Sequence, residues 1–270
     1  MADISKLLQS VKLPVMPEVA QALIRTLNEE DTDITKIRDV ISKDPALTAT
    51  LLRMANSAIF GLSRSVTTLE QAVSVVGTSQ IRARALSICM ANVFSLPPGI
   101  DRMAFWRDSM TCAGYAKWLA VGKGMDEHQA WLTGMMLRLG QLIIGQHDQS
   151  SIEKIELTPR KPGERWQRER TVCGFDEGQI TAEIARRWDF PEAVVQALAA
   201  SSQPLETTPF SELGAVVHLS ALLADYPQVT VETLTELPQP VVHQLELNLM
   251  FLSLHLPDAQ AFSDTSMLQA

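Results

Sequence analysis

The sequence predicts an all-α fold. Strand signals are nearly absent, because the 270 residues contain no Asn-Gly or Asp-Gly hairpin turn and no alternating run of β-branched residues. Helix-starting residues recur instead, and apolar side chains return every three or four positions, as on one face of a helix. The predicted helices are short and no heptad repeat persists, which favours a compact bundle of crossing helices over a coiled coil.

The first half of the chain begins with three predicted helices. Apolar side chains mark one face of a helix over residues 17–28, and Asp33 is placed to cap the helix that follows. Asp44 and Pro45 begin the third, since a proline costs little at the first helical position. Each of these starts predicts a short helix with one buried face.

Two further helices complete this half. Thr68 is placed to cap a short helix that ends at Gly77, a residue suited to a left-handed helix stop. Thr78 is placed to cap the next helix, through "SQIRARALSICMANVF". The Pro-Pro-Gly sequence at 97–99 then predicts a break between two halves of the molecule.

The second half of the chain is predicted to contain a longer series of apolar helices. They are expected at "FWRDSMTCAGYAKWLA", "GMMLRLGQLII", "DEGQITAEIARRWDF", residues 191–200, "FSELGAVVHLSALLADYP" and "PQPVVHQLELNLMFLSLHLP". The segment "GMMLRLGQLII" is interpreted as one buried helix that contains Arg138. The polar segment "RKPGERWQRER" is interpreted as a solvated face rather than a binding patch.

Composition restricts the classes of function. A net charge of -8 argues against a broad nucleic-acid or membrane-surface footprint. The start of the chain has no secretory signal pattern and no apolar run is long enough to span a membrane, so we expect a soluble cytoplasmic protein. Three scattered cysteines and five isolated histidines form no metal-ligand spacing.

Several blocks occur in an informative order: "LPVMPEVAQALIRTL", "ISKDPALTATLLRMANSAIFG", "VTTLEQAVSVVGTSQIRARAL", "FWRDSM" and "GFDEGQITAEIARRWDFPEAVVQAL". Together they resemble the HDOD domain family, bacterial signalling domains related to the HD metal-dependent phosphohydrolases. The resemblance implies a compact, two-lobed, HD-like helical bundle over residues 13–208, with lobes of about 13–96 and 100–208. Residues 1–12 are then an N-terminal helix or extension, and residues 209–270 a helical extension packed on the second lobe.

The same resemblance implies a metal site that has lost its ligands. An HD hydrolase needs His and Asp side chains that converge on divalent ions and lower the pKa of a bound water. In the family pattern these ligands fall at positions that here carry other residues: Asp108, Arg138, Leu139, Glu177, Ser201, Ser202 and, by a weaker alignment, Ala221. His218 is typical of the family at its place, but one imidazole cannot hold two metal ions.

Arg138 gives this loss an electrostatic reason. A guanidinium about 4 Å from a divalent cation would be repelled by roughly 8 kcal/mol at an effective dielectric constant of 20. We hypothesise that Arg138 replaces the metal as an internal cation and pairs with Asp108 and Glu177. The alternative is that Arg138 reaches solvent from a half-exposed helix and pairs with nothing in particular.

These observations favour a non-catalytic bacterial signalling adaptor that binds a partner protein, with no metal and no cofactor. One alternative is a metal-dependent phosphohydrolase whose metal ligands have moved to other positions: Asp108, Glu177 and Asp225. Another is binding of a signalling nucleotide, such as a cyclic dinucleotide, without hydrolysis.

The candidate interaction surface combines a loop and a helix. Ile59 and Phe60 lie in the "NSAIFGLSR" loop and either face a partner or fix that loop to the core. Arg82 and Arg84 are two apart on a helix, so they form one phosphate clamp only if Arg64 joins them.

Overall fold

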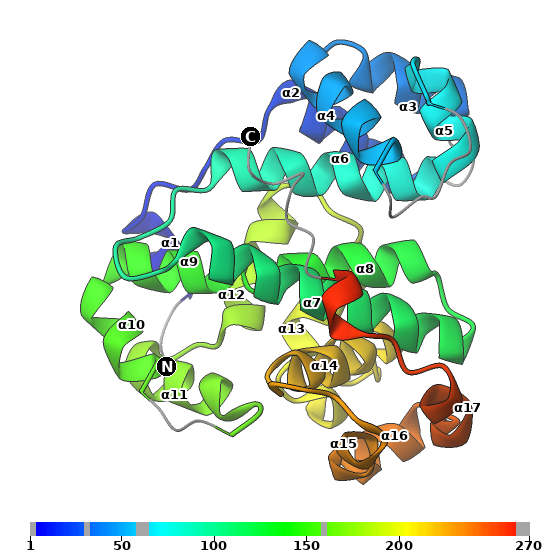
Figure 1. Ribbon diagram of the computed structural model, residues 1–270. Coiled ribbons are helices and arrows are strands. Elements are labelled where there is room, and N and C mark those ends of the chain that lie inside the picture. Colours follow the sequence, from blue (N-terminus) through cyan, green and yellow to red (C-terminus); the bar gives the residue numbers. More distant parts are fainter. Residues whose placement is uncertain (1–3, 30–32, 58–64, 158–160, 263–270) are drawn as a thin grey trace. The chain divides into compact units, whose positions relative to one another are not determined.

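The computed structural model describes residues 4–29, 33–57, 65–157 and 161–262, and every regular element in this part of the chain is a helix (Figure 1). The all-α prediction is confirmed. The described chain divides into two compact units. The smaller comprises Pro14–Phe94 and Trp188–Pro191, and the larger comprises the rest.

The described part of the smaller unit contains five helices. They are α2 (Glu18–Leu27), α3 (Ile34–Ile41), α4 (Pro45–Ala55), α5 (Leu69–Val76) and α6 (Thr78–Val93). The predicted caps at Asp33 and Asp44 are present: Asp33 accepts a hydrogen bond from the backbone N–H of Thr35, and Asp44 accepts from Ala46 and Leu47. Each aspartate therefore satisfies N–H groups that the first helical turn leaves without partners.

The boundary between α5 and α6 differs from the prediction. Thr68 caps α5 as expected, in a reciprocal capping box with Gln71. Thr78, however, is the first residue of α6 and does not cap it. The single residue between the helices is Gly77, at φ 95° and ψ 146°, rather than in the left-handed helical conformation expected. Its N–H donates to Val73 and its C=O accepts from Ile81, so one glycine ends one helix and begins the next.

The short segment 188–191 belongs to this unit through local contacts. Trp188 packs edge to face on Phe94, with 5.8 Å between ring centroids. The side-chain amide of Asn28 donates to the carbonyl of Asp189. Residues that follow α12 in the sequence therefore complete the smaller unit.

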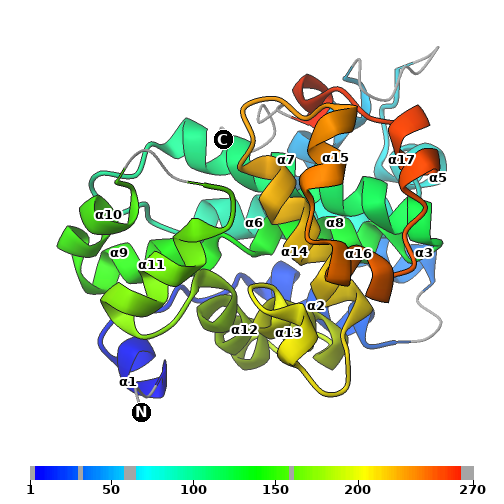
Figure 2. The same cartoon turned by 90° about the horizontal axis from the view of Figure 1, so that it is seen from below.

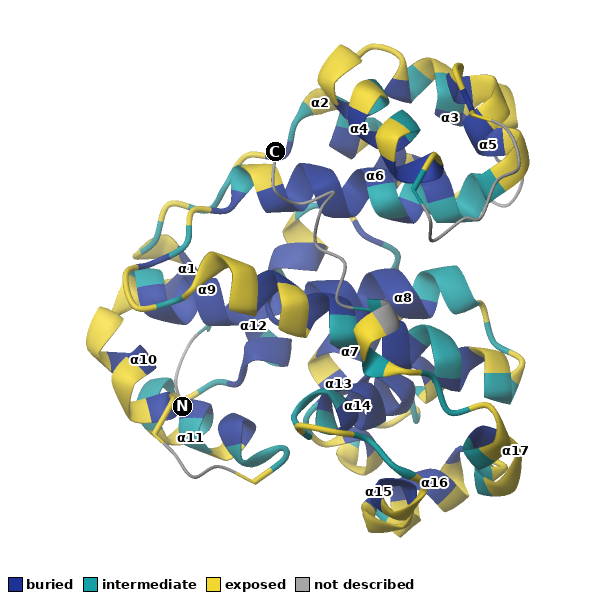
Figure 3. Ribbon diagram, viewed as in Figure 1, coloured by how far each residue is buried: buried dark blue, intermediate teal, exposed yellow. Residues whose placement is uncertain are grey.

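The larger unit carries the remaining helices. They are α1 (Ile4–Gln9), α7 (Arg102–Lys123), α8 (Glu127–Met136), α9 (Leu139–His147), α10 (Gln149–Ile155), α11 (Glu164–Cys173), α12 (Glu177–Arg187), α13 (Glu192–Ala200), η2 (Pro204–Glu206), α14 (Glu212–Ala224), α15 (Val231–Glu236), α16 (Gln239–Gln244), α17 (Leu249–Leu254) and η3 (Ala259–Phe262). The long helix α7 packs against α8 and α14, and these contacts form the centre of the unit. Figure 3 shows most of α9 and α14, and α8 from Ala130 onward, as buried.

The C-terminal helices cover one end of this centre. Apolar side chains of α15, α16 and α17 join α7 and α14 in a single core cluster, and Figure 2 shows these short helices around α14. The segment 238–257 was expected to form one helix, but it forms α16 and α17 with a turn at Leu245–Asn248. Glu246 adopts a positive φ of 53° in that turn, which a continuous helix does not allow. Helix α15 was not predicted.

The segment 134–144 is also two helices rather than one. Helix α8 ends at Met136 and α9 begins at Leu139, so Arg138 is the residue before a helix. The hydroxyl of Thr181 accepts from the N–H of Gly140 at 2.8 Å and donates to the carbonyl of Leu137 at 3.0 Å. A side chain of α12 thus satisfies backbone groups that the break leaves without helical partners.

The polar segment 160–170 is not simply a solvated face. Its described part forms most of α11, in which Arg165, Trp166 and Glu169 are buried. The interpretation as a solvated face is therefore wrong for these three residues. Composition alone misses the burial because the two charged residues pair with each other, four positions apart.

Close packing of α9 on α12 at Gly140 generates a stability prediction. A Cβ at Gly140 would lie 2.2 Å from the carbonyl oxygen of Glu177, a backbone atom that cannot rotate away. We expect Gly140→Ala to destabilise the protein by about 3 kcal/mol in urea unfolding. The control is Gly124→Ala. An added Cβ there would meet no atom within 4 Å, but Gly124 has a φ of 76°, so the substitution should lower the free energy of unfolding by about 1 kcal/mol. Equal costs for the two variants would contradict this packing.

Candidate functional site

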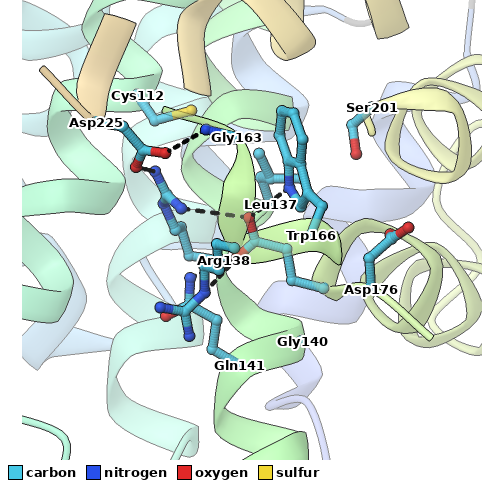
Figure 4. A network of polar contacts seen from close by, with 12 residues as sticks. Cys112, Leu137, Arg138, Gly140, Gln141, Gly163, Trp166, Asp176, Ser201 and Asp225 are labelled. Atoms are coloured by element: carbon cyan, nitrogen blue, oxygen red, sulfur yellow. Dashed lines mark hydrogen bonds and ion pairs between the residues drawn. The ribbon is translucent and has the colours of Figure 1, made fainter. Parts of the chain in front are cut away.

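Arg138 is buried between two carboxylates of the larger unit. Its Nη1 lies 3.3 Å from Oε1 of Glu177, and its Nη2 lies 3.0 Å from Oδ1 of Asp225 (Figure 4). The side chain is only 5% exposed, so the alternative that it reaches solvent is wrong. Burial acts to lower the pKa of Arg138, but the two carboxylates outweigh it and raise that pKa, which keeps the guanidinium charged.

The second carboxylate differs from the one expected. The hypothesis paired Arg138 with Glu177 and Asp108; the structure pairs it with Glu177 and Asp225. Asp108 is exposed on α7, and its charge raises the pKa of Arg138 less than those of the two paired carboxylates do. The physical reason is position, because Asp225 lies directly after the buried helix α14, whereas Asp108 faces solvent.

Glu177 receives hydrogen bonds at both carboxylate oxygens. Oε1 accepts from Nε1 of Trp166 at 3.0 Å in addition to Arg138, and Oε2 accepts from the amide of Gln141 at 2.5 Å. Its backbone N–H donates to Oε2 of Glu169 at 2.7 Å. A fully buried carboxylate is tolerated only with such compensation, so its neighbours fix the position of Glu177.

A second buried ion pair lies next to Glu177. Nε of Arg165 donates to Oε1 of Glu169 at 2.8 Å, and Arg165 also pairs with Glu156. Burial, together with the negative charge of Glu177, raises the pKa of Glu169, while Arg165 opposes that rise. The network thus extends from Asp225 through Arg138 and Glu177 to Glu169 and Arg165.

Asp225 connects this network to the start of α11. Its Oδ2 accepts from the backbone N–H of Gly163 at 3.0 Å. Gly163 has a φ of 74°, a conformation that favours glycine, and immediately precedes α11. Arg138, Glu177 and Asp225 therefore tie together α9, α12, α14 and the start of α11.

The other positions implied by the resemblance have different neighbours. Leu139 is completely buried and Ala221 is buried on α14. The hydroxyl of Ser201 donates to the carbonyl of Leu198, and the hydroxyl of Ser202 donates to Asp176. Figure 4 shows Ser201 and Asp176 on the opposite side of Trp166 from Arg138. The structure therefore brings Arg138 and Glu177 together with Asp225, but not with these serines.

His218 is held as a neutral, stacked side chain. Its ring lies on that of Trp166 with 5.0 Å between centroids and 25° between planes. Burial lowers the pKa of His218 to about 4, despite an opposing effect of the carbonyl of Ser201. Nδ1 lies 2.7 Å from that carbonyl, which requires it to donate when the imidazole is neutral.

The residues present do not fit a divalent metal. Among the described residues, no group of three or more His, Cys, Asp or Glu side chains is arranged to hold a metal ion. Glu177 and Asp225, two of the relocated ligands considered above, are separated by the guanidinium of Arg138. Cys112 is fully buried, and burial raises the pKa of its thiol to about 11.

The candidate interaction surface is only partly described. Ile59, Phe60 and Arg64 lie outside the described residues. Arg82 and Arg84 are half-buried on α6 in the smaller unit, and Arg82 donates to the backbone carbonyl of Thr26. Arg138 is committed to buried ion pairs in the larger unit, so its guanidinium is not presented to a nucleotide at the surface.

Sequence reasoning missed several members of the network: Gln141, Gly163, Arg165, Trp166 and Glu169. One signal was available, because Arg165 and Glu169 have the spacing of a helical ion pair, with Trp166 beside them. Gln141 and Gly163 carry no comparable signal in the sequence.

Comparison with known proteins agrees with the fold. The sequence model of the HDOD domain family matches residues 13–204, and the chain belongs to this family. The crystal structure of "Putative phosphohydrolase from Shewanella amazonensis SB2B" has a TM-score of 0.80 at 24% identity, over 97% of both chains. An HDOD domain protein with unknown function from Geobacter sulfurreducens has a TM-score of 0.74 at 20% identity, over 98% of this chain and 91% of that one.

Two further relatives are longer than this chain. A "Putative signal transduction protein" from Marinobacter aquaeolei VT8 has a TM-score of 0.78 at 19% identity, over 99% of this chain and 66% of that one. An uncharacterized protein of Treponema pallidum (strain Nichols) is 22% identical over 189 residues, 69% of this chain. The chain spans 37% of the length of that relative. The structural likenesses, all under 25% identity, show a shared fold.

None of the helices in the described ranges combines the length and the apolar composition that a membrane span requires. This finding is consistent with the sequence, which has no long apolar run.

The buried ion pair predicts strong coupling between its members. Arg138→Met should destabilise the protein by about 3–5 kcal/mol, because it leaves the carboxylates of Glu177 and Asp225 buried without their cation. In Arg138→Met/Glu177→Gln, the loss should be smaller than the sum of the single losses by at least ~1 kcal/mol. Urea unfolding of the double-mutant cycle measures this coupling.

The exposed pair of Arg187 and Glu183, at 3.1 Å, is the matched control for that cycle. Its coupling should stay below about 1 kcal/mol. Additive losses at Arg138 and Glu177 would show that the buried contact does not stabilise the fold.

The neutral state of His218 predicts a pH dependence. An unfolded histidine, with a pKa of 6.5, binds a proton that the folded protein does not accept until about pH 4. The free energy of unfolding therefore includes the whole contribution of His218 above pH 6.5. It decreases by roughly 3 kcal/mol as the pH falls from 6.5 towards 4. Urea unfolding from pH 7.5 to 4.5 should show this slope, and His218→Asn should reduce it. An unchanged slope in that variant would exclude His218 as its source.

Proposed function

We propose that this HDOD protein is a bacterial regulatory adaptor that binds a protein partner and does not catalyse hydrolysis. The observation that carries the proposal is the guanidinium of Arg138 between Glu177 and Asp225. The related hydrolases need metal ions at this site. In this protein the site instead contains the permanent positive charge of the Arg138 guanidinium. The fixed charge supports a binding role over a metal-dependent one.

The chemistry of the neighbouring residues supports the same proposal. Metal-dependent hydrolysis requires a bound water whose pKa is lowered by a divalent ion. Leu139 offers no lone pair, and both oxygens of Glu177 already accept hydrogen bonds from protein donors. Recruiting an ion would require these contacts to break and Arg138 to move out of a buried position.

In this proposal the network has a structural role. Arg138 joins residues from α9, α12 and α14, a function that a metal ion could serve in the related hydrolases. The resulting rigid unit would present its outer surface to a partner. The likeness in fold to a protein named for signal transduction is consistent with such a role.

The direct test is metal binding and hydrolysis by the full chain. We expect no saturable Mn²⁺ binding by calorimetry and no Mn²⁺-dependent hydrolysis of bis(p-nitrophenyl) phosphate. The variant Arg138→His/Leu139→Asp places the family's ligand pair at these positions and tests whether loss of this pair alone excludes metal. Its Mn²⁺ affinity should exceed that of the wild type.

Metal binding and turnover by the wild-type protein would be the contrary result. Stoichiometric metal in the wild-type protein, with turnover that is lost in Asp108→Ala or Asp225→Asn, would overturn the proposal. Circular dichroism of each variant establishes that the loss does not arise from unfolding.

A further inference from the structure

The C-terminal part of the chain contains acidic residues without basic ones. From Trp188 to Ala270 the sequence has ten Asp and Glu residues and no Lys or Arg. All 23 Lys and Arg residues precede this part, together with the other 21 Asp and Glu residues, so the negative net charge of the chain comes from its C-terminal part. A surface built from these residues therefore attracts cationic ligands and repels anionic ones.

Helix α17 exposes apolar side chains within this acidic part of the chain. Met250 is 76% exposed, Leu254 is 74% exposed and Phe251 is 41% exposed. We call these three side chains the α17 face. Leu252 of the same helix is buried against α7, since a Cβ at Gly122 would lie 2.7 Å from its Cδ2. Leu252 therefore attaches α17 to the core, and the α17 face remains exposed.

The α17 face is a group of neighbouring side chains. Met250, Phe251 and Leu254 have the spacing of residues on one side of a helix. The ring of His255 lies on that of Phe251, with 4.3 Å between centroids, and its Nδ1 lies 2.8 Å from the carbonyl of Phe251. Scattered exposed apolar residues are ordinary on a protein surface, whereas a contiguous group of them is typical of an interaction site.

Exposed carboxylates lie on the elements beside this face, and we call them the acidic border. They are Glu232 and Glu236 on α15, which packs against α17, Glu246 in the turn before α17, and Asp258 after it. Figure 3 shows exposed residues on both α15 and α17. Nζ of Lys123 lies 3.7 Å from Glu246, so this one carboxylate is partly neutralised. The other three form no ion pair with a described residue.

The charge of the border selects among the occupants that could cover the α17 face. A second copy docked through the same face would bring carboxylates against carboxylates, and an anionic lipid surface would be repelled in the same way. The chain's own last residues, SDTSMLQA, contain no Lys or Arg. Met250 and Leu254 are four residues apart, about 6 Å along the helix, which matches apolar residues four apart on a partner helix.

We infer that the α17 face and its acidic border bind a cationic amphipathic helix of a partner protein. The apolar side of that helix covers Met250, Phe251 and Leu254, and its Lys or Arg residues meet the acidic border. The inference rests on the protein-binding role proposed above, to which it adds a surface and a class of partner.

The test uses the full chain and a fluorescent model peptide of leucine and lysine, about 14 residues long, with its leucines at helical spacing. Fluorescence anisotropy at about 0.05 M NaCl should show saturable binding to the wild type. The same peptide with glutamate in place of lysine should not bind. A scrambled peptide of the same composition should bind about tenfold more weakly, because its leucines do not form one side of a helix.

Removal of the apolar contacts tests the α17 face. Met250→Ser/Leu254→Ser should weaken peptide binding about tenfold or more. The matched control is Leu157→Ser, which changes an exposed leucine elsewhere in the larger unit and should leave the affinity within about twofold of the wild type. Circular dichroism tests the fold of each variant.

Removal of charge tests the acidic border separately. Glu232→Gln/Glu236→Gln/Glu246→Gln should weaken binding about fivefold at about 0.05 M NaCl, and this difference should disappear near 0.5 M because salt screens exposed charges. The control is Glu153→Gln, on the exposed side of α10, which should leave the affinity unchanged.

No saturable binding by the wild type, or equal affinity of the wild type and Met250→Ser/Leu254→Ser, would overturn the inference. So would a wild-type dimer in sedimentation velocity, or wild-type binding to phosphatidylglycerol vesicles, that this variant loses, because the occupant would then be a second copy or a membrane. Each of these results leaves the Mn²⁺ test unchanged, so a failure here is distinguishable from a failure of the proposed function.

Discussion

The buried guanidinium of Arg138 sets the structure of the larger unit around it. An arginine is almost never fully buried without partners, because the removal of a charge from water costs far more than one hydrogen bond returns. Two carboxylates from different helices, Glu177 and Asp225, compensate that cost. Since neither carboxylate is near Arg138 in the sequence, their pairing fixes α9, α12 and α14 relative to one another. The break between α8 and α9 places Arg138 where it can reach both.

This arrangement has a consequence for chemistry. Buried ion pairs contribute little net stability compared with apolar packing, but the loss of one partner is strongly destabilising. The site is therefore suited to remain closed, and poorly suited to exchange Arg138 for a ligand or an ion. A closed site whose charges are paired is consistent with the proposed role, in which the surface of the protein binds a partner.

Much of the fold could be predicted from local signals. The caps at Asp33, Asp44 and Thr68 act within one turn of their own helix, so the sequence carries them directly. The break before α9 could not be predicted in this way, because it depends on a hydroxyl from Thr181, 41 residues away from the N–H of Gly140. Within the site, the resemblance to the family, which implies that these positions converge, together with their complementary charges predicted the pair of Arg138 and Glu177. It could not choose between two aspartates, because that choice depends on which of them is buried.

The central claim is that Arg138 holds the place of an ion, and a crystal of the full chain soaked in MnCl₂ tests it most directly. The account predicts no anomalous peak within coordination distance of Glu177, with the guanidinium still between Glu177 and Asp225. An ordered manganese ion bound to both carboxylates, with Arg138 displaced, would contradict it.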